Sequence, residues 1–371
     1  MKIKCRREEL IMALSSITRN SLSKTTMPIL EGVLIETNEK DIKLTTNDLE
    51  IGSEYIINAT IETSGSTVID LKTFSEIIRK IEAEEIDLEL KDNVFIIKSA
   101  SGIFKLSTMN PEEYTKLPVF NVEKEVTISQ KLFKDMIRKT VFSTSVDQNR
   151  PVYTGSLISI ENGIMVVVAI DGFRMAVRKE ILEDKNLNFR AIIPAKTLNE
   201  IMKSLTDNDE DMVKIGVNKN QILFQIGPCT VISRIIEGDF LNYNSIIPSE
   251  VDTTLTINRK SLLVSLERVS IFSKEVSEKD KKVPVKMNIN IDSLNISCVS
   301  VTGDAKETIK TVVEGKELEI GFNPRYLLEA LKVIEEDNIV LDFSSSISPL
   351  IIKPVSGNKY LYMVLPVKLK D

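Results

Sequence analysis

The residues in this 371-residue chain that could act chemically are mainly lysines and arginines, because the usual catalytic sets are missing. The chain has no histidine, which excludes serine–histidine and cysteine–histidine catalysis and any histidine metal site. Cys5, Cys229 and Cys298 lie far apart and form no CxxC pair, so we interpret them as small hydrophobic residues of a protein in a reducing compartment. No paired-carboxylate arrangement stands out among the acidic residues. These absences argue against an enzyme.

One short stretch, Asp171-Gly172-Phe173-Arg174, superficially resembles the metal-binding motif of protein kinases. Neither a glycine-rich phosphate loop nor a catalytic-loop pattern accompanies it. A turn that enters a strand is the better interpretation. We therefore expect no catalytic residue, no metal ion and no cofactor.

Basic residues gather on one predicted amphipathic helix, which runs from Ser129 to Phe142. Its apolar residues recur every three to four positions and form one face. The residues off that face are mostly basic: Lys131, Lys134, Arg138 and Lys139. Side chains of this kind can contact a phosphate backbone without reading bases.

This helix pattern occurs three times, so the chain is built from a repeat. The apolar positions return at offsets of 123 and then 129 residues: Leu10 and Leu14, Phe133 and Ile137, Leu262 and Leu266. The three copies span 5–20, 129–142 and 258–273, and a second helix follows each copy, at 72–82, 195–205 and 324–334. We predict three repeated domains, at 1–125, 126–250 and 251–371.

Short apolar segments between the helices predict strands. In the first domain they cover 27–36, 41–46 and 54–62 before the second helix, and 86–90, 94–98 and 103–107 after it. Short connections favour antiparallel pairing. The expected fold class is α+β, with two helices per domain backed by antiparallel sheets.

Positive charge is concentrated on the six predicted helices. They carry a net charge of +9 and the rest of the chain carries −15, which gives the net charge of −6. Charged helix faces that simply meet water are the alternative interpretation. We favour a basic surface formed by helices and backed by acidic sheets, which would attract a phosphate backbone.

The spacing of packed helices indicates how many such helices a ring around DNA would need. Packed helices lie about 8–10 Å apart, so side chains would fill the centre of a ring of six helices. In a ring of twelve, the axes of opposite helices would lie about 34 Å apart. That span suits a nucleic-acid duplex. Two chains joined head to tail would supply the twelve helices.

Four motifs, spread over the whole length, resemble the bacterial DNA polymerase III β subunit, the replicative sliding clamp. They are Pro28–Gly32, Asp171–Ala176, Ser233–Phe240 and Leu365–Leu369. The resemblance implies three clamp-type domains in a head-to-tail homodimeric ring. Such a ring encircles duplex DNA independently of sequence and tethers the replicative polymerase as a non-catalytic processivity factor.

The resemblance also implies partners that bind through short peptide motifs, namely the replicative polymerase, the clamp loader and repair polymerases. The alternative is a peptide-binding scaffold of repeated domains that does not act on DNA. Nothing in the sequence predicts export, since Met1–Leu10 is charged and no stretch reaches about 18 apolar residues. We expect a soluble protein of the cytoplasm, without a membrane partner.

Two sets of surface residues follow in part from the resemblance. The family's DNA contacts map to two polar loops and add Lys24, Asp147 and Gln148 to the helix residues Lys131, Lys134 and Arg138; a solvated loop is the alternative. The family's dimer interface maps to an apolar edge strand and to the end of a helix: Ile103, Phe104 and Leu106, with Ile271 and Phe272. Burial in their own domain cores is the alternative for this second set.

The family's partner-peptide pocket maps between the second and third domains. Its residues come from three separate stretches: Tyr153, Ile170, Gly172, Phe173, Arg174, Met175, Ser245, Ile246, Met363, Leu365 and Pro366. An internal ion pair or stacking on an aromatic ring is the alternative for Arg174, and plain core is the alternative for the apolar members. The sequence departs from the family pattern at Ile170, Phe173 and Leu365, which suggests altered partner preference. Deletion of 363–371 is expected to leave a folded dimer that no longer binds peptide.

The basic residues generate a prediction about salt. Reversing the charge of Lys24, Lys131, Lys134 and Arg138 together is expected to weaken DNA association and flatten its salt dependence. Each lost phosphate contact removes about 0.9 from the slope of log K against log salt. An unchanged slope in a salt titration of DNA binding would contradict this assignment.

Overall fold

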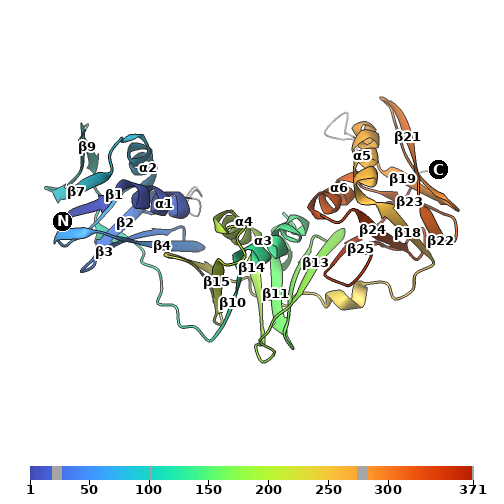
Figure 1. The fold of residues 1–371 in the computed structure, drawn as a ribbon, viewed down its shortest axis with the longest axis horizontal. Coiled ribbons are helices and arrows are strands. Elements are labelled where there is room, and N and C mark those ends of the chain that lie inside the picture. The colour runs from blue at the N-terminus through green and yellow to red at the C-terminus, as the bar shows by residue number, and fades with distance from the viewer. Residues whose placement is uncertain (19–26, 101, 274–282, 370–371) are drawn as a thin grey trace. The chain divides into compact units, whose positions relative to one another are not determined.

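The structure is a computed structural model and describes residues 1–18, 27–100, 102–273 and 283–369. The chain divides into two compact units. The first unit comprises Met1–Lys134 and Lys196–Ile235, and the second comprises Asp135–Ala195 and Ile236–Asp371. Figure 1 shows the ribbon with the helices and strands labelled.

The first unit contains two antiparallel sheets. Across the five-stranded sheet the order is β5 (Thr60–Thr63), β1 (Lys2–Arg6), β7 (Glu85–Lys91), β8 (Val94–Ser99) and β9 (Gly102–Ser107). Across the eight-stranded sheet it is β10 (Lys124–Ser129), β15 (Met212–Val217), β16 (Gln221–Ile226), β17 (Cys229–Arg234), β4 (Ile51–Asn58), β3 (Asp41–Asn47), β2 (Gly32–Thr37) and β6 (Ser66–Asp70). Strand β17 therefore lies beside β4, although nearly half of the chain separates them in sequence.

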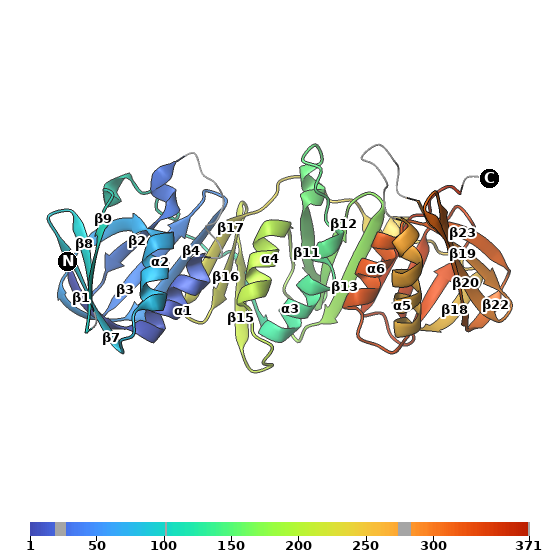
Figure 2. The ribbon, with the colours of Figure 1, turned by 90° about the horizontal axis from the view of Figure 1, so that it is seen from above.

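Helices α1 (Arg7–Thr18) and α2 (Leu71–Lys80) pack side by side in this unit (Figure 2). Their apolar faces are buried with residues of both sheets in one core. Within it the Phe74 and Phe95 rings meet edge to face, with centroids 5.8 Å apart. Helix α2 begins at Asp70, whose carboxylate accepts a hydrogen bond from Thr73 N at 2.7 Å.

The second unit also has two antiparallel sheets. The nine-stranded sheet has the order β14 (Phe189–Pro194), β11 (Gly155–Glu161), β12 (Ile164–Ile170), β13 (Arg174–Ile181), β26 (Tyr360–Val364), β25 (Leu350–Pro354), β24 (Asn338–Phe343), β18 (Thr253–Asn258) and β22 (Val312–Gly315). The four-stranded sheet has the order β21 (Gly303–Lys310), β20 (Ser293–Ser300), β19 (Val285–Asn290) and β23 (Leu318–Phe322). Helices α5 (Arg259–Val269) and α6 (Pro324–Val333) pack together against this core.

The predicted pattern of two helices per repeat, backed by antiparallel sheets, is confirmed. The remaining helices are α3 (Gln130–Arg138) and α4 (Ala195–Ser204), and the repeated apolar residues are buried. The domain boundaries at 125 and 250 stay a prediction. All three cysteines are buried, and burial raises the pKa of the Cys229 thiol to about 12. That thiol stays protonated, as expected of a hydrophobic residue.

Several predicted boundaries were wrong. The helices predicted at 129–142 and 258–273 end as α-helix at Arg138 and Val269, and short 3₁₀ turns follow at Val141–Ser143 and Ser270–Ser273. The strand predicted at 27–36 opens with a 3₁₀ turn, Pro28–Glu31, because proline lacks the N–H that a strand ladder requires. Strands β1 and β6 were missed.

The repeated glycines of the sequence, Gly32 and Gly155, stand where neighbouring backbone leaves no room for a side chain. A Cβ on Gly155 would lie 2.4 Å from the carbonyl oxygen of Ile193, on the paired strand β14. A Cβ on Gly32 would lie 3.0 Å from the carbonyl oxygen of Ile69, on the paired strand β6. The close strand contact explains why glycine recurs at the offset of 123.

Gly155→Ala is therefore expected to lower the free energy of unfolding by about 1–3 kcal/mol, because backbone must shift to admit the methyl group. Gly102→Ala is the control, since its Cβ would meet only the Phe104 ring at 3.8 Å. The control should change stability by less than about 0.5 kcal/mol. Equal urea midpoints for the two variants would contradict this explanation.

Candidate functional site

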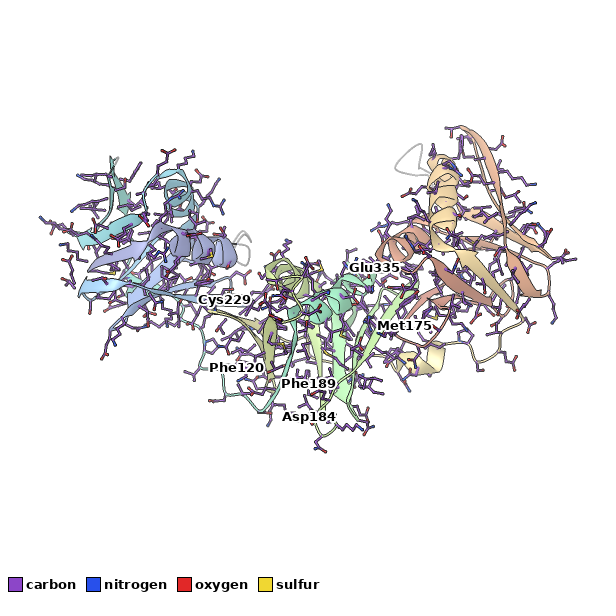
Figure 3. The ribbon with its side chains drawn as sticks, viewed as in Figure 1. Phe120, Met175, Asp184, Phe189, Cys229 and Glu335 are labelled. Atoms are coloured by element: carbon purple, nitrogen blue, oxygen red, sulfur yellow. The ribbon has the colours of Figure 1, made fainter. Side chains whose placement is uncertain are left out.

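A row of apolar side chains crosses four neighbouring strands of the nine-stranded sheet. Ile170 on β12 lies opposite Met175 on β13, Met175 lies opposite Met363 on β26, and Met363 lies opposite Ile351 on β25. Ile170, Met175 and Met363 are all buried in one hydrophobic cluster, which we call the β13–β26 surface. Figure 3 labels Met175 on β13.

Two 3₁₀ turns from other parts of the second unit pack against this cluster. Tyr153, in Pro151–Thr154, and Ile246, in Tyr243–Ile246, are half-buried on it. The Tyr153 ring meets the Phe240 ring edge to face at 5.8 Å. Ser245 is exposed in the second turn, where its hydroxyl donates to Asn242 O at 2.7 Å. The structure thus brings the three predicted stretches together, and their role in binding stays a prediction.

The turn that precedes β13 is held by one carboxylate. Asp171 Oδ1 accepts hydrogen bonds from Phe173 N at 2.9 Å and Arg174 N at 3.0 Å. Gly172 has φ +90 with open space around it, a conformation that L side chains rarely adopt. The turn exposes Phe173 to 59%, stacked on Tyr326, and the Phe173 carbonyl accepts from Leu365 N at 2.9 Å. Phe173, Leu365 and Pro366 consequently form the accessible rim of the β13–β26 surface.

Arg174, a member of the predicted set, has a side chain that is 5% exposed and makes internal contacts. Arg174 Nε donates a hydrogen bond to Asp171 Oδ2 at 2.9 Å, and Nη2 donates to the Phe142 carbonyl oxygen at 2.6 Å. The remaining nitrogen, Nη1, donates to the Glu329 carboxylate. The guanidinium also lies over the Tyr326 ring at 4.6 Å. The internal ion pair and the stacking that were the alternative for Arg174 are both present. Any role of Arg174 in peptide binding stays a prediction.

The structure corrects the expectation for a deletion of 363–371. Met363 and Val364 are 5% and 1% exposed on β26, an inner strand of the sheet. Their removal would open the core. Point substitutions from Leu365 onward test the surface without that damage.

The predicted DNA-contacting bases on α3 lie next to acidic residues. Lys131 and Lys134 make ion pairs with Asp209 and Asp207, at 2.6 and 2.9 Å. Both acids follow α4. Acids that follow the second helix thus partly neutralise the expected basic surface, because they pair with bases on the first helix.

Arg138 at the end of α3 is likewise paired. It contacts Asp135 and Glu335, which follows α6 and is labelled in Figure 3. Burial raises the pKa of the Asp135 carboxyl, but hydrogen bonds from Lys139 and Arg138 outweigh that effect and hold the pKa below its usual value. Exposed pairs of this kind contribute only about 0–1 kcal/mol, so a phosphate could replace the Glu335 carboxylate at little cost.

The loop predictions divide between described and undescribed residues. Asp147 and Gln148 are both exposed. Asp147 Oδ1 accepts from Asn149 N at 3.0 Å, which closes a local turn. Lys24 lies outside the described residues.

The predicted interface residues lie on or near sheet edges. Ile103 and Phe104 on β9 are 62% and 39% exposed, whereas Leu106 packs partly into its own core. Ile271 is 58% exposed, and Phe272 packs partly against the core of the second unit. Strand β21, an edge of the four-stranded sheet, was not predicted from the sequence; it begins at Gly303, against the Phe272 ring. Its alternating exposed and half-buried residues are the signal that could have revealed it.

Comparison with known proteins covers the whole chain. Family models match residues 1–118 as the N-terminal domain, 127–242 as the central domain and 244–368 as the C-terminal domain of the DNA polymerase III beta subunit. The chain belongs to the DNA polymerase III beta subunit family. The prediction of three clamp-type domains is confirmed.

Named relatives and solved structures agree with the family. The beta sliding clamp of Halalkalibacterium halodurans is 33% identical over 381 residues, 98% of each chain, and that of Bacillus subtilis is 30% identical over 380 residues, covering 99% of this chain and 100% of that one. The structure of a putative beta subunit from Eubacterium rectale has a TM-score of 0.95 at 32% identity, and the B. subtilis clamp has 0.95 at 31%, each covering both chains fully. The prediction of a sliding clamp of DNA replication, rather than an enzyme, is confirmed by these matches.

Within the described ranges no helix is long and apolar enough to cross a membrane. Across the same part of the chain, no group of three or more cysteine or acidic side chains could hold a metal ion.

Arg174→Ala is expected to lower the free energy of unfolding by about 3–5 kcal/mol, because Asp171 and Glu329 lose their buried partner. Arg325→Ala is the matched control, since Arg325 pairs with the same Glu329 from a side chain that is 60% exposed. The control should cost only about 0–1 kcal/mol. Equal losses of unfolding free energy for the two variants, measured by urea unfolding, would contradict the view that burial makes the Arg174 pairs the stronger ones.

Proposed function

We propose that two copies of this chain join head to tail into a ring that encircles duplex DNA and holds the replicative polymerase on it in the cytoplasm. Family membership supports the clamp function. The observation that carries the ring is a group of exposed apolar residues at one sheet edge in each unit: Ile103 and Phe104 on the edge strand β9, and Ile271 in the turn that contacts the edge strand β21. Two different edges on one chain are what a head-to-tail closure requires.

Both edges have the character of surfaces that need a partner. Among the described strands β9 pairs only with β8, and β21 pairs only with β20. Each thus offers unpaired backbone groups, and β9 adds the exposed apolar side chains of Ile103 and Phe104, which invite pairing with another strand. Antiparallel addition of β9 from one copy to β21 of the next would extend both sheets and cover Ile103, Phe104 and Ile271.

The DNA contact proposed for this ring is electrostatic and independent of sequence. Lys131, Lys134 and Arg138 carry it, with Lys24, Asp147 and Gln148 from the loops. The bases on α3 keep exposed side chains of 51%, 27% and 39%. Phosphates that compete with Asp209, Asp207 and Glu335 would be held weakly at any one position, which suits movement along the duplex.

The β13–β26 surface is the proposed docking site for short peptide segments of the polymerase, the clamp loader and repair polymerases. Met175 and Met363 lie buried beneath the rim, and methionine side chains repack easily, which suits one surface that serves several partners. Phe173 and Leu365 form its accessible rim, and with Ile170 they are the departures from the family pattern. Differences in partner preference are therefore proposed to arise there.

Phe104→Asp is expected to convert the dimer into folded monomers, because the charge would be buried without a partner at the β9–β21 contact. Phe173→Asp is the control, since that aromatic is also exposed but belongs to the turn between β12 and β13, in a different sheet from β9 and from β21. Solution mass by light scattering distinguishes the two states. A Phe104→Asp chain that remains dimeric would contradict closure through β9.

Leu365→Lys is expected to weaken binding of a fluorescein-labelled peptide of the glutamine–leucine–phenylalanine type by at least about tenfold, or about 1.4 kcal/mol. Val367→Lys, two residues further on and 40% exposed, is the control. Fluorescence anisotropy gives both affinities. Equal affinities for the two variants would place the peptide elsewhere.

A further inference from the structure

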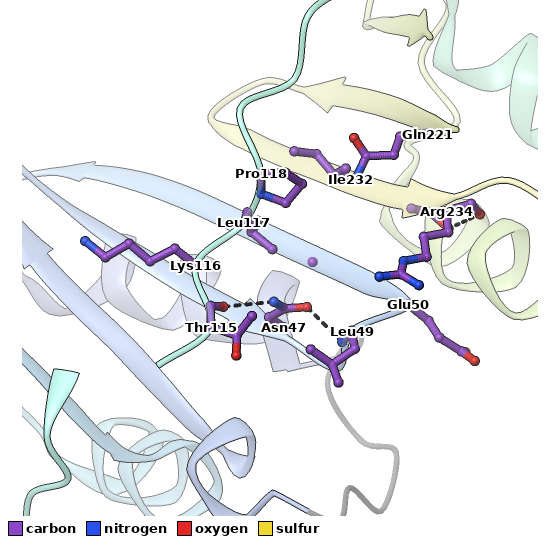
Figure 4. Close-up of a pocket in the computed structure, with 12 residues that line it drawn as sticks. Asn47, Leu49, Glu50, Thr115, Lys116, Leu117, Pro118, Gln221, Ile232 and Arg234 are labelled. Carbon is purple, nitrogen blue, oxygen red and sulfur yellow. Dashed lines mark hydrogen bonds between the residues drawn. The ribbon is translucent and has the colours of Figure 1, made fainter. Parts of the chain in front are cut away.

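A pocket opens in the first unit between the loop before β4, the end of β17 and the segment 115–118 (Figure 4). Its volume is about 100 Å³. Leu49, Leu117, Pro118 and Ile232 supply apolar walls, and Arg234 stands at its margin. Leu49 is 43% exposed, so part of this apolar surface meets solvent.

The strands beneath this pocket repeat the register of the β13–β26 surface. Residues of β4 correspond to β13 at an offset of 123, and residues of β17 correspond to β26 at an offset of 131. Five residue pairs between β4 and β17 thereby match, in order, five pairs between β13 and β26. The pairs of the first unit are Ile51–Ser233, Gly52–Ile232, Ser53–Val231, Glu54–Thr230 and Tyr55–Cys229. Their counterparts in the second unit are Arg174–Val364, Met175–Met363, Ala176–Tyr362, Val177–Leu361 and Arg178–Tyr360. All five pairs correspond without a shift.

The turn beside the pocket repeats the same backbone bonds. Asp48 Oδ1 accepts from Glu50 N at 3.0 Å and from Ile51 N at 2.7 Å, as Asp171 does in the second unit. Arg234 N donates to the Glu50 carbonyl at 3.1 Å, as Leu365 N does to Phe173. The pocket is therefore the repeat counterpart of the β13–β26 surface.

Leu49 occupies the position of Gly172 and keeps its unusual backbone. Its φ is +73, in the left-handed region that disfavours branched or bulky L side chains. Strained residues of this kind gather at binding sites. Here the strain holds an apolar side chain at the opening of the pocket.

Side-chain differences from the β13–β26 surface define what the pocket can accept. Gly52 replaces Met175, and Leu117 fills the space above it, since a Cβ on Gly52 would lie 2.0 Å from Leu117 Cδ2. The remaining volume is smaller than the roughly 150 Å³ cavity that holds benzene. The pocket is therefore expected to favour a flexible aliphatic side chain over a rigid aromatic ring.

Charge adds a second requirement. Arg234 takes the place of Leu365, is exposed, and makes no side-chain ion pair or hydrogen bond within the described part of the chain. Lys116 is already paired with Glu36 at 2.7 Å, and Glu50 is the acid that lines the pocket. Arg234 is thus the group available to a carboxylate on a ligand.

We propose that this pocket is a second peptide site, which takes a linear segment with one leucine-like side chain followed by an acidic residue. The class of ligand rests on the proposed peptide binding at the β13–β26 surface. The size limit and the arginine make the two sites differ in preference.

The test follows the isoleucine methyl signals of the full-length chain by NMR, because Ile232 lines the pocket and Ile170 and Ile246 lie in the β13–β26 surface. The probes are the capped tripeptides Gly-Leu-Asp, Gly-Phe-Asp and Gly-Leu-Lys. Gly-Leu-Asp is expected to shift the Ile232 methyl to saturation. The other two probes should bind at this methyl at least about tenfold more weakly.

Leu49→Asn removes the apolar wall but keeps the turn, since asparagine tolerates the left-handed region. This substitution should weaken the affinity for Gly-Leu-Asp, measured at the Ile232 methyl, at least tenfold. Leu241→Asn, at a leucine 38% exposed in the second unit, is the control and should leave it unchanged. An Ile232 response that survives Leu49→Asn undiminished overturns the proposal.

The remaining outcomes separate this site from the proposed function. If Gly-Leu-Asp and the glutamine–leucine–phenylalanine peptide move only Ile170 and Ile246, the pocket is not a site and the proposed function stands. If Ile232 responds but neither peptide moves Ile170 or Ile246, the pocket stands and the β13–β26 docking site falls. If no methyl responds to either peptide, both proposals fail.

Discussion

Antiparallel pairing between strands from different repeats is the interaction on which the rest of the structure depends. Strand β4 pairs with β17 in the first unit, and β13 pairs with β26 in the second. A sheet with an open apolar edge is unstable toward association, so each repeat covers an edge of its neighbour. At the two ends of the series, β9 and β21 are edge strands, each paired on one side only within the described chain. The same constraint that joins the repeats makes these two edges candidates for pairing with a second copy.

The sequence predicted the local features well, because helix periodicity and short strands depend on neighbouring residues. The buried faces of Leu10, Phe133 and Leu262 follow from spacing alone. Pairings between distant strands could not be predicted this way, since register is set by contacts that lie far apart in the sequence. The same limit applied to Arg174, whose partner Glu329 comes from a helix 155 residues away. Counting charge by helix likewise missed that Asp207, Asp209 and Glu335 lie against the bases of α3.

Those ion pairs shape how a clamp can hold DNA. A surface of free lysines would bind phosphate tightly and resist movement, whereas bases already paired with exposed acids gain little by exchanging one anion for another. Retention must then come from the closed topology of a ring rather than from affinity. An acidic chain with net charge −6 is compatible with that division of roles.

Topology is therefore the most direct test of the account. The chain is loaded by its clamp loader on nicked circular DNA, the circle is cut once with a restriction enzyme, and bound protein is followed by gel filtration. The account predicts long retention on the circle and rapid loss after linearisation, with the same DNA sequence present in both. Equal retention on the circular and linear forms would contradict encirclement and favour a scaffold that binds DNA, if at all, from one side.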